Sequence, residues 1–284
     1  MLLRIFALMK FQKWLWVVLI TYAPSLFAQE TTPPPSSHRI QAKTTTKSAF
    51  KAGEWFKFRI YYGIFNASYA TLELTEAAWG GQPAFYAKGI GRTTGLARLF
   101  FKVDDYYSSY FTKKENRPLH FIRNINEGGY TKNLTIDFDN ESKQAKVTDL
   151  KKETTSTYYT ASKVQDLISF VYYLRKNLDV DAIKKDEFVF VNLFFDSENY
   201  VFKFKFLGRE TIKTKYGKVK TLKFRPYVQS GRVFRSSESI TLWVSSDDNK
   251  IPLRLQADLS VGSITADLEE FKGLKNSFEI VVEK

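Results

Sequence analysis

Apolar and polar residues alternate with a period of two along most of the chain after Ala49. The segment EWFKFRIYYG places Phe56, Phe58 and Ile60 on one side of an extended chain, and YVFKFKFLG repeats the pattern with aromatic residues. Successive side chains of a strand point to opposite faces, so this alternation is typical of strands that bury one face. The pattern predicts a mainly β protein.

The residues between the alternating runs predict that neighbouring strands are antiparallel. Three hairpins can be placed from their turn residues, at 140–142, at 216–217 and at 247–249. These turns contain Asn, Gly and Asp, which favour the backbone conformations of tight turns. We therefore expect an antiparallel sheet of many strands.

One segment, TASKVQDLISFVYYLRKNL, has apolar residues at helical spacing instead. Ser162 is a candidate N-cap, and Asp166 lies early, where the helix dipole favours a negative charge. Arg175 and Lys176 lie near the other end, where the dipole favours positive charge. The segment predicts the one strong helix after the amino-terminal region.

The run FVFVNLFF at residues 188–195 is apolar at nearly every position, which predicts a strand buried on both faces. One simple arrangement places one face under the helix and the other inside a curled sheet. The predicted fold is therefore an antiparallel curled sheet that forms a barrel or half-barrel with one packed α-helix.

The amino-terminal residues 1–28 are typical of a secretory signal peptide. Three basic residues precede an apolar core at residues 14–20, and Ala28 is a small residue suited to cleavage. An uncleaved membrane anchor is the alternative. The apolar core is short for a bilayer span of ~20 residues, however, and Pro24 interrupts it. No later apolar run has spanning length, so we expect no integral membrane span after signal cleavage and a periplasmic location.

Residues 29–48 are rich in Thr, Ser, Pro and Lys and poor in large apolar residues, which predicts a flexible lead-in. Residues 49–284 then form a single β-rich domain in this interpretation. The sequence contains no Cys, which excludes disulfides and a lipid anchor on cysteine. Aromatic residues make up 16% of the chain, so material for a core is plentiful.

The charge is basic. The sequence has 43 Lys and Arg against 30 Asp and Glu. Removing the predicted signal leaves 40 against 30, a net charge of +10. An exported basic protein meets anionic lipid headgroups and acidic glycans, and we expect no nucleic acid partner. Solubility alone is the alternative reason for the charge.

Catalytic and metal-binding motifs are sparse. Of the two histidines, His38 is in the lead-in and His120 is in a predicted strand, where a local partner would satisfy it. The adjacent Asp104 and Asp105 point to opposite faces of a strand, so they cannot form one catalytic pair. The Asp and Glu residues at 137–141 straddle a turn and lack the glycine of a calcium loop. We expect no catalytic residue, no metal ligand and no cofactor, and hence no enzyme.

The stretch GRTTGLARLFFKVDDYYSSYF, residues 91–111, begins like a phosphate-binding loop but lacks the Lys–Ser/Thr pair. We interpret it as a turn at residues 93–95 that leads into an amphipathic strand. Here and in the following strand, cations are interleaved with phenylalanines, an arrangement that could hold an amphiphile with an anionic head. The same side chains could instead extend over a core. The candidate ligand-binding residues are Arg92, Phe101, Lys102 and Arg123.

Several motifs occur together in an order and spacing that resembles one bacterial exported family, catalogued as domain of unknown function 3108. They include ATLELTEA, PLHFIRNINEGGYTKNLTIDFD, QDLISFVYYLR, LGRETIKTKYGKVKTLKFRP and LWVSSDDNKIPLRLQADLSVGSITADL, together with the stretch above. The resemblance covers roughly residues 48–275. It implies an extracytoplasmic protein of mostly antiparallel β structure, and it implies no reaction.

Three functions remain open from the sequence. The first is a non-catalytic binding or carrier protein of the cell envelope, with a lipid or anionic amphiphile as ligand. The second is an envelope assembly or structural factor that binds another envelope protein through a sheet edge or through a basic hairpin, which carries Lys213, Lys215, Lys218 and Lys220. The third is an enzyme that acts on envelope polysaccharide.

Overall fold

The computed structural model describes residues 37–39, 48–227, 240–259 and 261–282. The predicted signal peptide and most of the predicted lead-in lie outside the described residues. Within the lead-in, Ser37–Arg39 form the short strand β1. In the described part of the chain, no helix is both long and apolar enough to cross a membrane.

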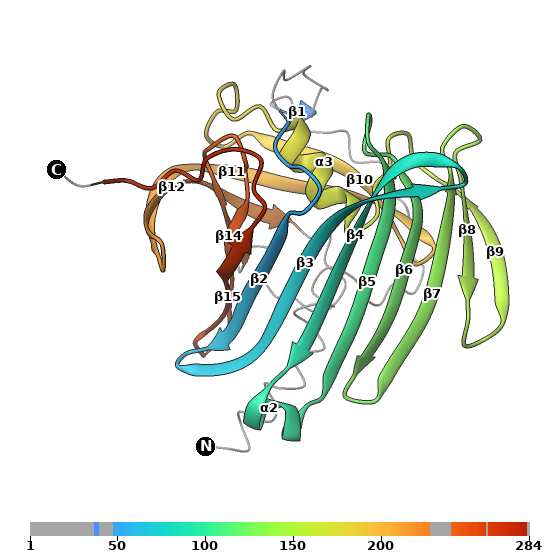
Figure 1. Cartoon of the computed structure of the whole chain (residues 1–284), viewed down its shortest axis with the longest axis horizontal. Helices are drawn as coiled ribbons and strands as arrows, with labels where there is room; N and C mark the ends of the chain where they lie inside the picture. Colours follow the sequence, from blue (N-terminus) through green and yellow to red (C-terminus); the bar gives the residue numbers. More distant parts are fainter. Residues whose placement is uncertain (1–36, 40–47, 228–239, 260, 283–284) are drawn as a thin grey trace.

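The described residues form one large sheet and two short helices, which confirms the predicted mainly β fold (Figure 1). Its strands are β1 (Ser37–Arg39), β2 (Trp55–Tyr62), β3 (Phe65–Trp79), β4 (Gln82–Thr93), β5 (Val103–Thr112), β6 (Pro118–Glu127), β7 (Tyr130–Asp139), β8 (Gln144–Asp149), β9 (Thr154–Tyr159), β10 (Phe188–Phe195), β11 (Glu198–Thr214), β12 (Gly217–Tyr227), β13 (Ile240–Ser245), β14 (Pro252–Asp258) and β15 (Ser263–Lys272).

The sheet consists of two meanders. Strands β2 to β9 follow one another, strands β10 to β15 do the same, and antiparallel pairing of β15 with β2 joins the two. Among the described strands, β1 alone pairs in parallel, with β10. The three predicted hairpins are confirmed as the turns between β7 and β8, β11 and β12, and β13 and β14. Because β1 and β9 are the outer strands, the sheet is a half-barrel and does not close.

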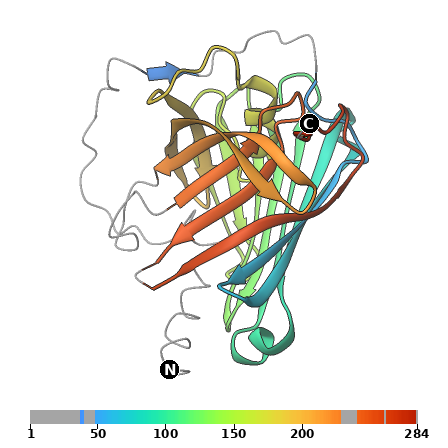
Figure 2. The same cartoon turned by 90° about the vertical axis from the view of Figure 1, so that its left-hand side faces the viewer.

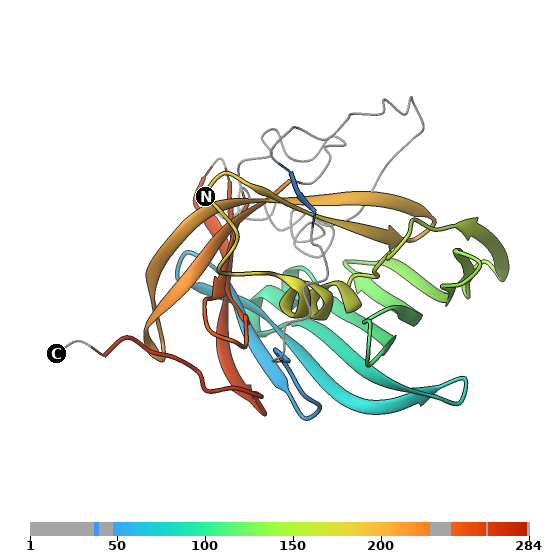
Figure 3. The ribbon, with the colours of Figure 1, turned by 90° about the horizontal axis from the view of Figure 1, so that it is seen from above.

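The sheet curls around the helix α3 (Ser169–Asn177), which lies inside the curl when the molecule is seen from above (Figure 3). In Figure 2 the strands of the second meander cross obliquely in front of those of the first. The chain between β9 and α3 runs along β10, where Gln165 N donates to Asn192 O at 2.8 Å and Phe194 N donates to Gln165 O at 2.9 Å. This connection spans the gap between the two edges of the half-barrel.

The helix begins later than the sequence suggested. Asp166 Oδ1 accepts the N–H groups of Ile168 and Ser169, both at 2.8 Å, so Asp166 satisfies the first free donors of α3. Ser162 lies outside the helix, and its carbonyl accepts a hydrogen bond from Asn192. The prediction of Ser162 as the N-cap is therefore wrong, because the segment before Asp166 follows β10 instead of coiling.

A second, short helix was not predicted. Residues Gly95–Phe100 form α2 between β4 and β5, where we expected the turn to lead directly into a strand. Gly95 has a φ of +54°, which suits glycine, and Arg98 bonds Asp104 with both guanidinium NH groups at 2.9 Å. These local contacts stabilise one and a half turns of helix. Beyond Lys102, the predicted alternation in β5 is confirmed by the buried Val103, Asp105 and Tyr107.

The two-sided burial predicted for residues 188–195 is only partly confirmed. Val189, Val191 and Leu193 of β10 are buried against the aromatic face of β11 and α3. On the other side, Phe188 and Phe190 are half-buried, whereas Phe194 near the end of the strand is fully buried in the core of the first meander. The predicted aromatic face of β11 is confirmed, since Phe202, Phe204 and Phe206 all lie in the core.

The two ends of the half-barrel differ. In an antiparallel meander alternate turns lie at the same end, so the β2–β3, β6–β7 and β8–β9 turns and α2 share one end, here called the α2 end (Figure 1). The turn between β14 and β15 lies at the same α2 end, because Ile264 at the start of β15 pairs with Tyr62 next to the β2–β3 turn. The opposite end, which α3 covers, is called the α3 end.

Candidate functional site

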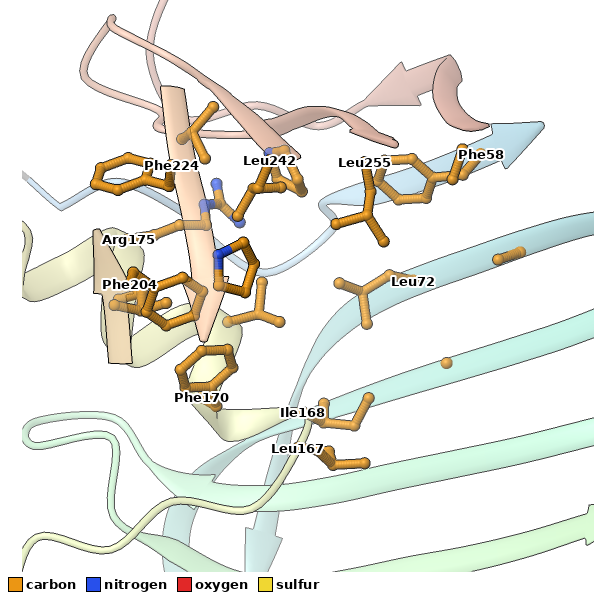
Figure 4. Close-up of a pocket in the computed structure, with 18 of the residues that line it drawn as sticks. Phe58, Leu72, Leu167, Ile168, Phe170, Arg175, Phe204, Phe224, Leu242 and Leu255 are labelled. Carbon is orange, nitrogen blue, oxygen red and sulfur yellow. The ribbon is translucent and has the colours of Figure 1, made fainter. Parts of the chain in front are cut away.

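A cavity of about 340 Å³ lies between α3 and the concave face of the sheet. Figure 4 shows side chains converging on it from different elements: Phe58 on β2, Leu72 on β3, Leu242 on β13 and Phe170 at the start of α3. Both meanders therefore contribute to its walls. Pockets that bind small molecules are typically concave and mostly apolar, as this one is.

Small residues leave the space open. Ala70 on β3, Gly89 on β4 and Ala266 on β15 all line the cavity. At Gly89 the helix segment comes close, since a Cβ added there would lie 3.3 Å from Ile168 Cδ1. The strand alternation sends the large aromatic side chains to the same concave face, so the cavity is lined by carbon with very few polar atoms.

The cavity extends from α3 toward the α2 end. Ile60 lines it and lies two residues before β2 ends at Tyr62. Pro226, near the end of β12, and Ile240, at the start of β13, line it at the same level. The space therefore follows the strand direction, which suits an elongated ligand.

Arg175 and Lys250 are the only charged residues among the described lining residues. Arg175 is already bound within the protein. Its guanidinium donates to both carboxylate oxygens of the fully buried Glu54, to Asn249 O at 2.9 Å and to Ala49 O at 3.0 Å. It also lies over the rings of Phe50, Phe56 and Tyr172. Arg175 therefore fixes α3 to the sheet and has little capacity left for a ligand.

Lys250 is the cation that remains. It follows the β13–β14 turn and is buried. Burial lowers its pKa, the nearby charge of Arg175 lowers it further, and the carboxylates of Asp248 and Asp179 act in the opposite direction. These carboxylates lie close enough to attract the amine electrostatically. A ligand anion in the cavity would therefore find its strongest electrostatic partner here.

The four residues predicted as a ligand site are not brought together. Arg92 lies opposite Asp104 in the β4–β5 pair, whereas Arg123 lies opposite Tyr107 in the β5–β6 pair. Asp104 and Tyr107 are three residues apart on one strand, so their side chains point to opposite faces. None of the four residues lines the cavity.

The four residues lie in three different environments. Arg92 and Lys102 are exposed on the outer face, 3.8 Å and 3.4 Å from Asp104. Phe101 is buried, and its ring packs against Gly128. Arg123 is buried on the inner face, donates to Asp196 at 2.8 and 3.0 Å, and lies over the Phe195 ring.

The opposite orientation of Asp104 and Asp105 is confirmed. Asp104 pairs with Arg98 on the outer face, and this hydrogen bond lowers its pKa. Asp105 is buried on the inner face, and burial raises its pKa to about 7. The buried side chain of Glu127, on β6, lies next to that of Asp105. Arg123, also on β6, is close enough for its charge to lower the pKa of Asp105 in part. This acidic pair lies apart from the cavity lining.

His120 is satisfied locally, as predicted. Its Nδ1 lies 2.6 Å from Asp137 Oδ1, and its ring stacks on Trp79 at 4.2 Å. Asp139 accepts the N–H groups of Glu141 and Ser142, which is the structural role expected of Asp in a turn.

Sequence reasoning missed the two cations of the cavity. Arg175 falls on the same helical stripe as Ile168 and Tyr172, and a charge on an apolar stripe was a signal that it is buried. Lys250 carried no comparable signal, because a lysine after a turn is ordinarily exposed. Only the tertiary contact between that turn and α3 places it beside the cavity.

The family model described as "Protein of unknown function (DUF3108)" matches residues 57–269. The chain belongs to the DUF3108 family. This match includes every strand from β3 to β14 and all of α3, and so covers the cavity described above. No curated protein sequence matches the chain.

One solved structure supports a related fold for this DUF3108 chain. A protein of Brucella abortus described as a β-barrel-like protein of domain of unknown function DUF1849 is similar with a TM-score of 0.50 and 10% identity, over 79% of this chain and 98% of that one. A DUF1089 family protein of Pseudomonas aeruginosa matches with a TM-score of 0.32 and 8% identity, over 68% of this chain and 92% of that one. The first similarity supports a β-barrel-like fold.

Proposed function

We propose that this DUF3108 protein is a non-catalytic carrier of a lipid or another anionic amphiphile in the bacterial cell envelope, with the periplasm as its compartment. The observation that carries the proposal is the 340 Å³ cavity, lined by carbon, with Lys250 as the one buried lysine of the described residues in its wall. The signal-like amino-terminal sequence supports export.

The cavity volume sets the size of the ligand. An apolar cavity of ~150 Å³ accommodates benzene, which has six carbons. On that scale, 340 Å³ holds an acyl chain of roughly a dozen carbons. Transfer of such a chain from water contributes about 10 kcal/mol at ~0.8 kcal/mol per methylene. Association costs at least ~4 kcal/mol, so we expect a dissociation constant on the order of 10–100 µM.

Lys250 selects the head group in this proposal. An anion placed beside its amine compensates the charge that burial disfavours, so carboxylate or phosphate ligands bind more tightly than their neutral analogues. Arg175 supports this selection indirectly, because its bonds to Glu54 hold α3 in place over the cavity.

Titration calorimetry with dodecanoate and with dodecanol tests both the cavity as the site of the apolar chain and Lys250 as the partner of the head group. We expect the full chain to bind both, and dodecanoate more tightly. Ala70→Phe should weaken both at least tenfold, because the added ring occupies the cavity. Ala78→Phe, on an exposed position of the same strand, is the matched control and should leave binding unchanged. Lys250→Met should remove the preference for dodecanoate.

Two results would overturn the carrier proposal. One is the absence of binding of either compound by the wild-type protein. The other is equal binding by the wild type, Ala70→Phe and a second cavity-filling variant, Ala266→Phe. If Lys250→Met retained the full preference, the cavity would stand as the site but the head-group assignment would be wrong.

An envelope assembly factor is the second candidate, and the outer strand β9 favours it. Every residue of β9 is exposed, and within the described residues β9 pairs with β8 alone, so its other edge can accept a strand of a partner. The basic β11–β12 hairpin is the other candidate surface. A protein partner that co-purifies and is lost on neutralising Lys213, Lys215, Lys218 and Lys220 would favour this function.

A further inference from the structure

The short helix α2 presents apolar side chains to solvent. No residue of α2 is buried, and Leu96, Leu99 and Phe100 are all exposed, Leu99 to 78%. In a globular protein an amphipathic helix normally buries its apolar side chains against the core. The next residue, Phe101, is buried, and its ring covers Gly128.

The β2–β3 turn extends this apolar surface. Ile64 is 93% exposed, and Phe65 beside it is exposed as well. The turn and α2 are neighbours, since Thr94 N donates to Ala67 O at 3.1 Å. We call this surface the apolar tip and define it by five residues: Ile64, Phe65, Leu96, Leu99 and Phe100.

Exposed apolar side chains also occur at other turns of the α2 end. Tyr130 at the start of β7, next to the β6–β7 turn, Leu150 in the β8–β9 turn and Val261 in the β14–β15 turn are also exposed. The turns at the α3 end have polar sequences instead, for example KKEN at 113–116, NESK at 140–143 and SDDN at 246–249. The exposed apolar residues in the turns are therefore concentrated at one end of the half-barrel, the end where α2 lies in Figure 1.

Cations flank the apolar tip. Arg92 and Lys102 stand on either side of α2, with side chains 67% and 57% exposed. The acidic group between them, Asp104, is already bonded at 2.9 Å to both NH groups of Arg98. Three cations thus surround one carboxylate, so the cluster has a net positive charge, and the side chains of Arg92 and Lys102 remain more than half exposed.

We propose that the apolar tip docks the protein on a membrane surface that contains anionic lipid. Apolar side chains on short turns enter the interfacial region of a bilayer, and flanking Arg and Lys bind the headgroups. Charge complementarity selects the anionic membrane as the occupant, because the exposed charges beside the tip are positive. The tip lies at the end toward which the cavity extends, so docking would bring the cavity close to the bilayer.

The tip is also held in a fixed position, which favours docking without rearrangement. Arg98 clamps α2 to β5 through Asp104, and Val103 N donates to Thr93 Oγ1 at 2.9 Å across its base. Binding by a preorganised surface avoids the ordering cost that a flexible loop would incur.

Vesicle flotation tests the docking directly. We expect the full chain to float with vesicles of phosphatidylcholine and phosphatidylglycerol, and much less with vesicles of phosphatidylcholine alone. Leu96→Ser/Leu99→Ser should reduce the bound fraction at least tenfold. Arg92→Gln/Lys102→Gln should reduce binding to the level seen with the neutral vesicles. Tyr159→Ser is the control, since Tyr159 is 79% exposed but lies at the α3 end, and it should bind like the wild type.

A site-specific probe locates the contact. Because the sequence has no cysteine, Leu99→Cys and Tyr159→Cys each give one labelling position for an environment-sensitive dye. The dye at position 99 should shift to shorter wavelength on addition of anionic vesicles, and the dye at position 159 should not. The absence of any flotation by the wild type would overturn the proposal, as would an equal shift at both positions. These readouts use no cavity ligand, so they do not depend on the carrier function.

Discussion

Replacing Glu54 with glutamine should strongly destabilise the protein. The carboxylate of Glu54 is fully buried and accepts two hydrogen bonds from Arg175, which is itself almost completely buried. Glutamine keeps the shape and one acceptor oxygen but removes the negative charge. The guanidinium then remains buried with neutral acceptors only, namely the glutamine oxygen and the carbonyls of Asn249 and Ala49.

The magnitude follows from the burial of both partners. Leaving one charge of a buried pair uncompensated costs about 3–5 kcal/mol. A typical domain has a stability of about 5–15 kcal/mol, so this loss is a large fraction of the total. The double variant Glu54→Leu/Arg175→Met should recover most of the loss, because it removes both charges and retains apolar volume.

Urea unfolding followed by tryptophan fluorescence measures the loss of unfolding free energy. The shift in the urea midpoint reports this loss when wild type and variant have the same dependence of free energy on urea concentration. Glu270→Gln is the matched control. It breaks the 2.8 Å pair of Glu270 with Lys57, which is on the surface, and it should leave the midpoint nearly unchanged. A loss for Glu54→Gln below about 1 kcal/mol, or one no larger than that of the control, would refute the reasoning about the buried pair.

Two further predictions concern the α2 end. Asp105 has a folded-state pKa of about 7 because of burial, above its unfolded value of about 3.9, so the folded state binds the proton more tightly. The free energy of unfolding should therefore fall as the pH rises from about 4 to 7. Urea unfolding at pH 5 and 8 measures this fall, which should be smaller in Asp105→Asn than in the wild type. An equal fall in both proteins would contradict the raised pKa of Asp105. Gly128→Ala places a Cβ 2.2 Å from the Phe101 ring, whereas Gly129 has positive φ without a neighbour, so Gly128→Ala should lower the melting temperature more than Gly129→Ala. Equal effects would mean that backbone strain alone matters.

The sheet could be predicted because its strands bury one face. The alternation around Phe56 and Phe202 indicates strands with one apolar side, and the tight turns between them indicate that neighbouring strands are antiparallel. The curvature of the sheet was predicted from the apolar run at 188–195 together with the one predicted helix, which needed a concave face to pack on. The pairing of β15 with β2 had no local signal, since it joins residues about 200 positions apart in the sequence.

The candidate site was harder to predict than the fold. Arg92 and Arg123 are both cations near phenylalanines in sequence, yet they lie on opposite faces of the sheet, because the strand register and not the composition decides the orientation. The cavity depends on small residues such as Ala70 and Gly89, which look like ordinary strand positions. The α2 helix was missed because its leucines and phenylalanine resemble a buried strand, although they are exposed.

The central claim is that the cavity carries an amphiphile, and mass spectrometry of the protein purified without detergent from its native source tests it most directly. Small molecules would be extracted from the wild type and from Ala70→Phe, each confirmed as folded by circular dichroism. The account predicts one anionic amphiphile per wild-type chain, with an apolar chain near a dozen carbons, and its loss from Ala70→Phe. A folded wild-type protein that yields no such molecule, or the same molecule in equal amount from both proteins, would contradict it.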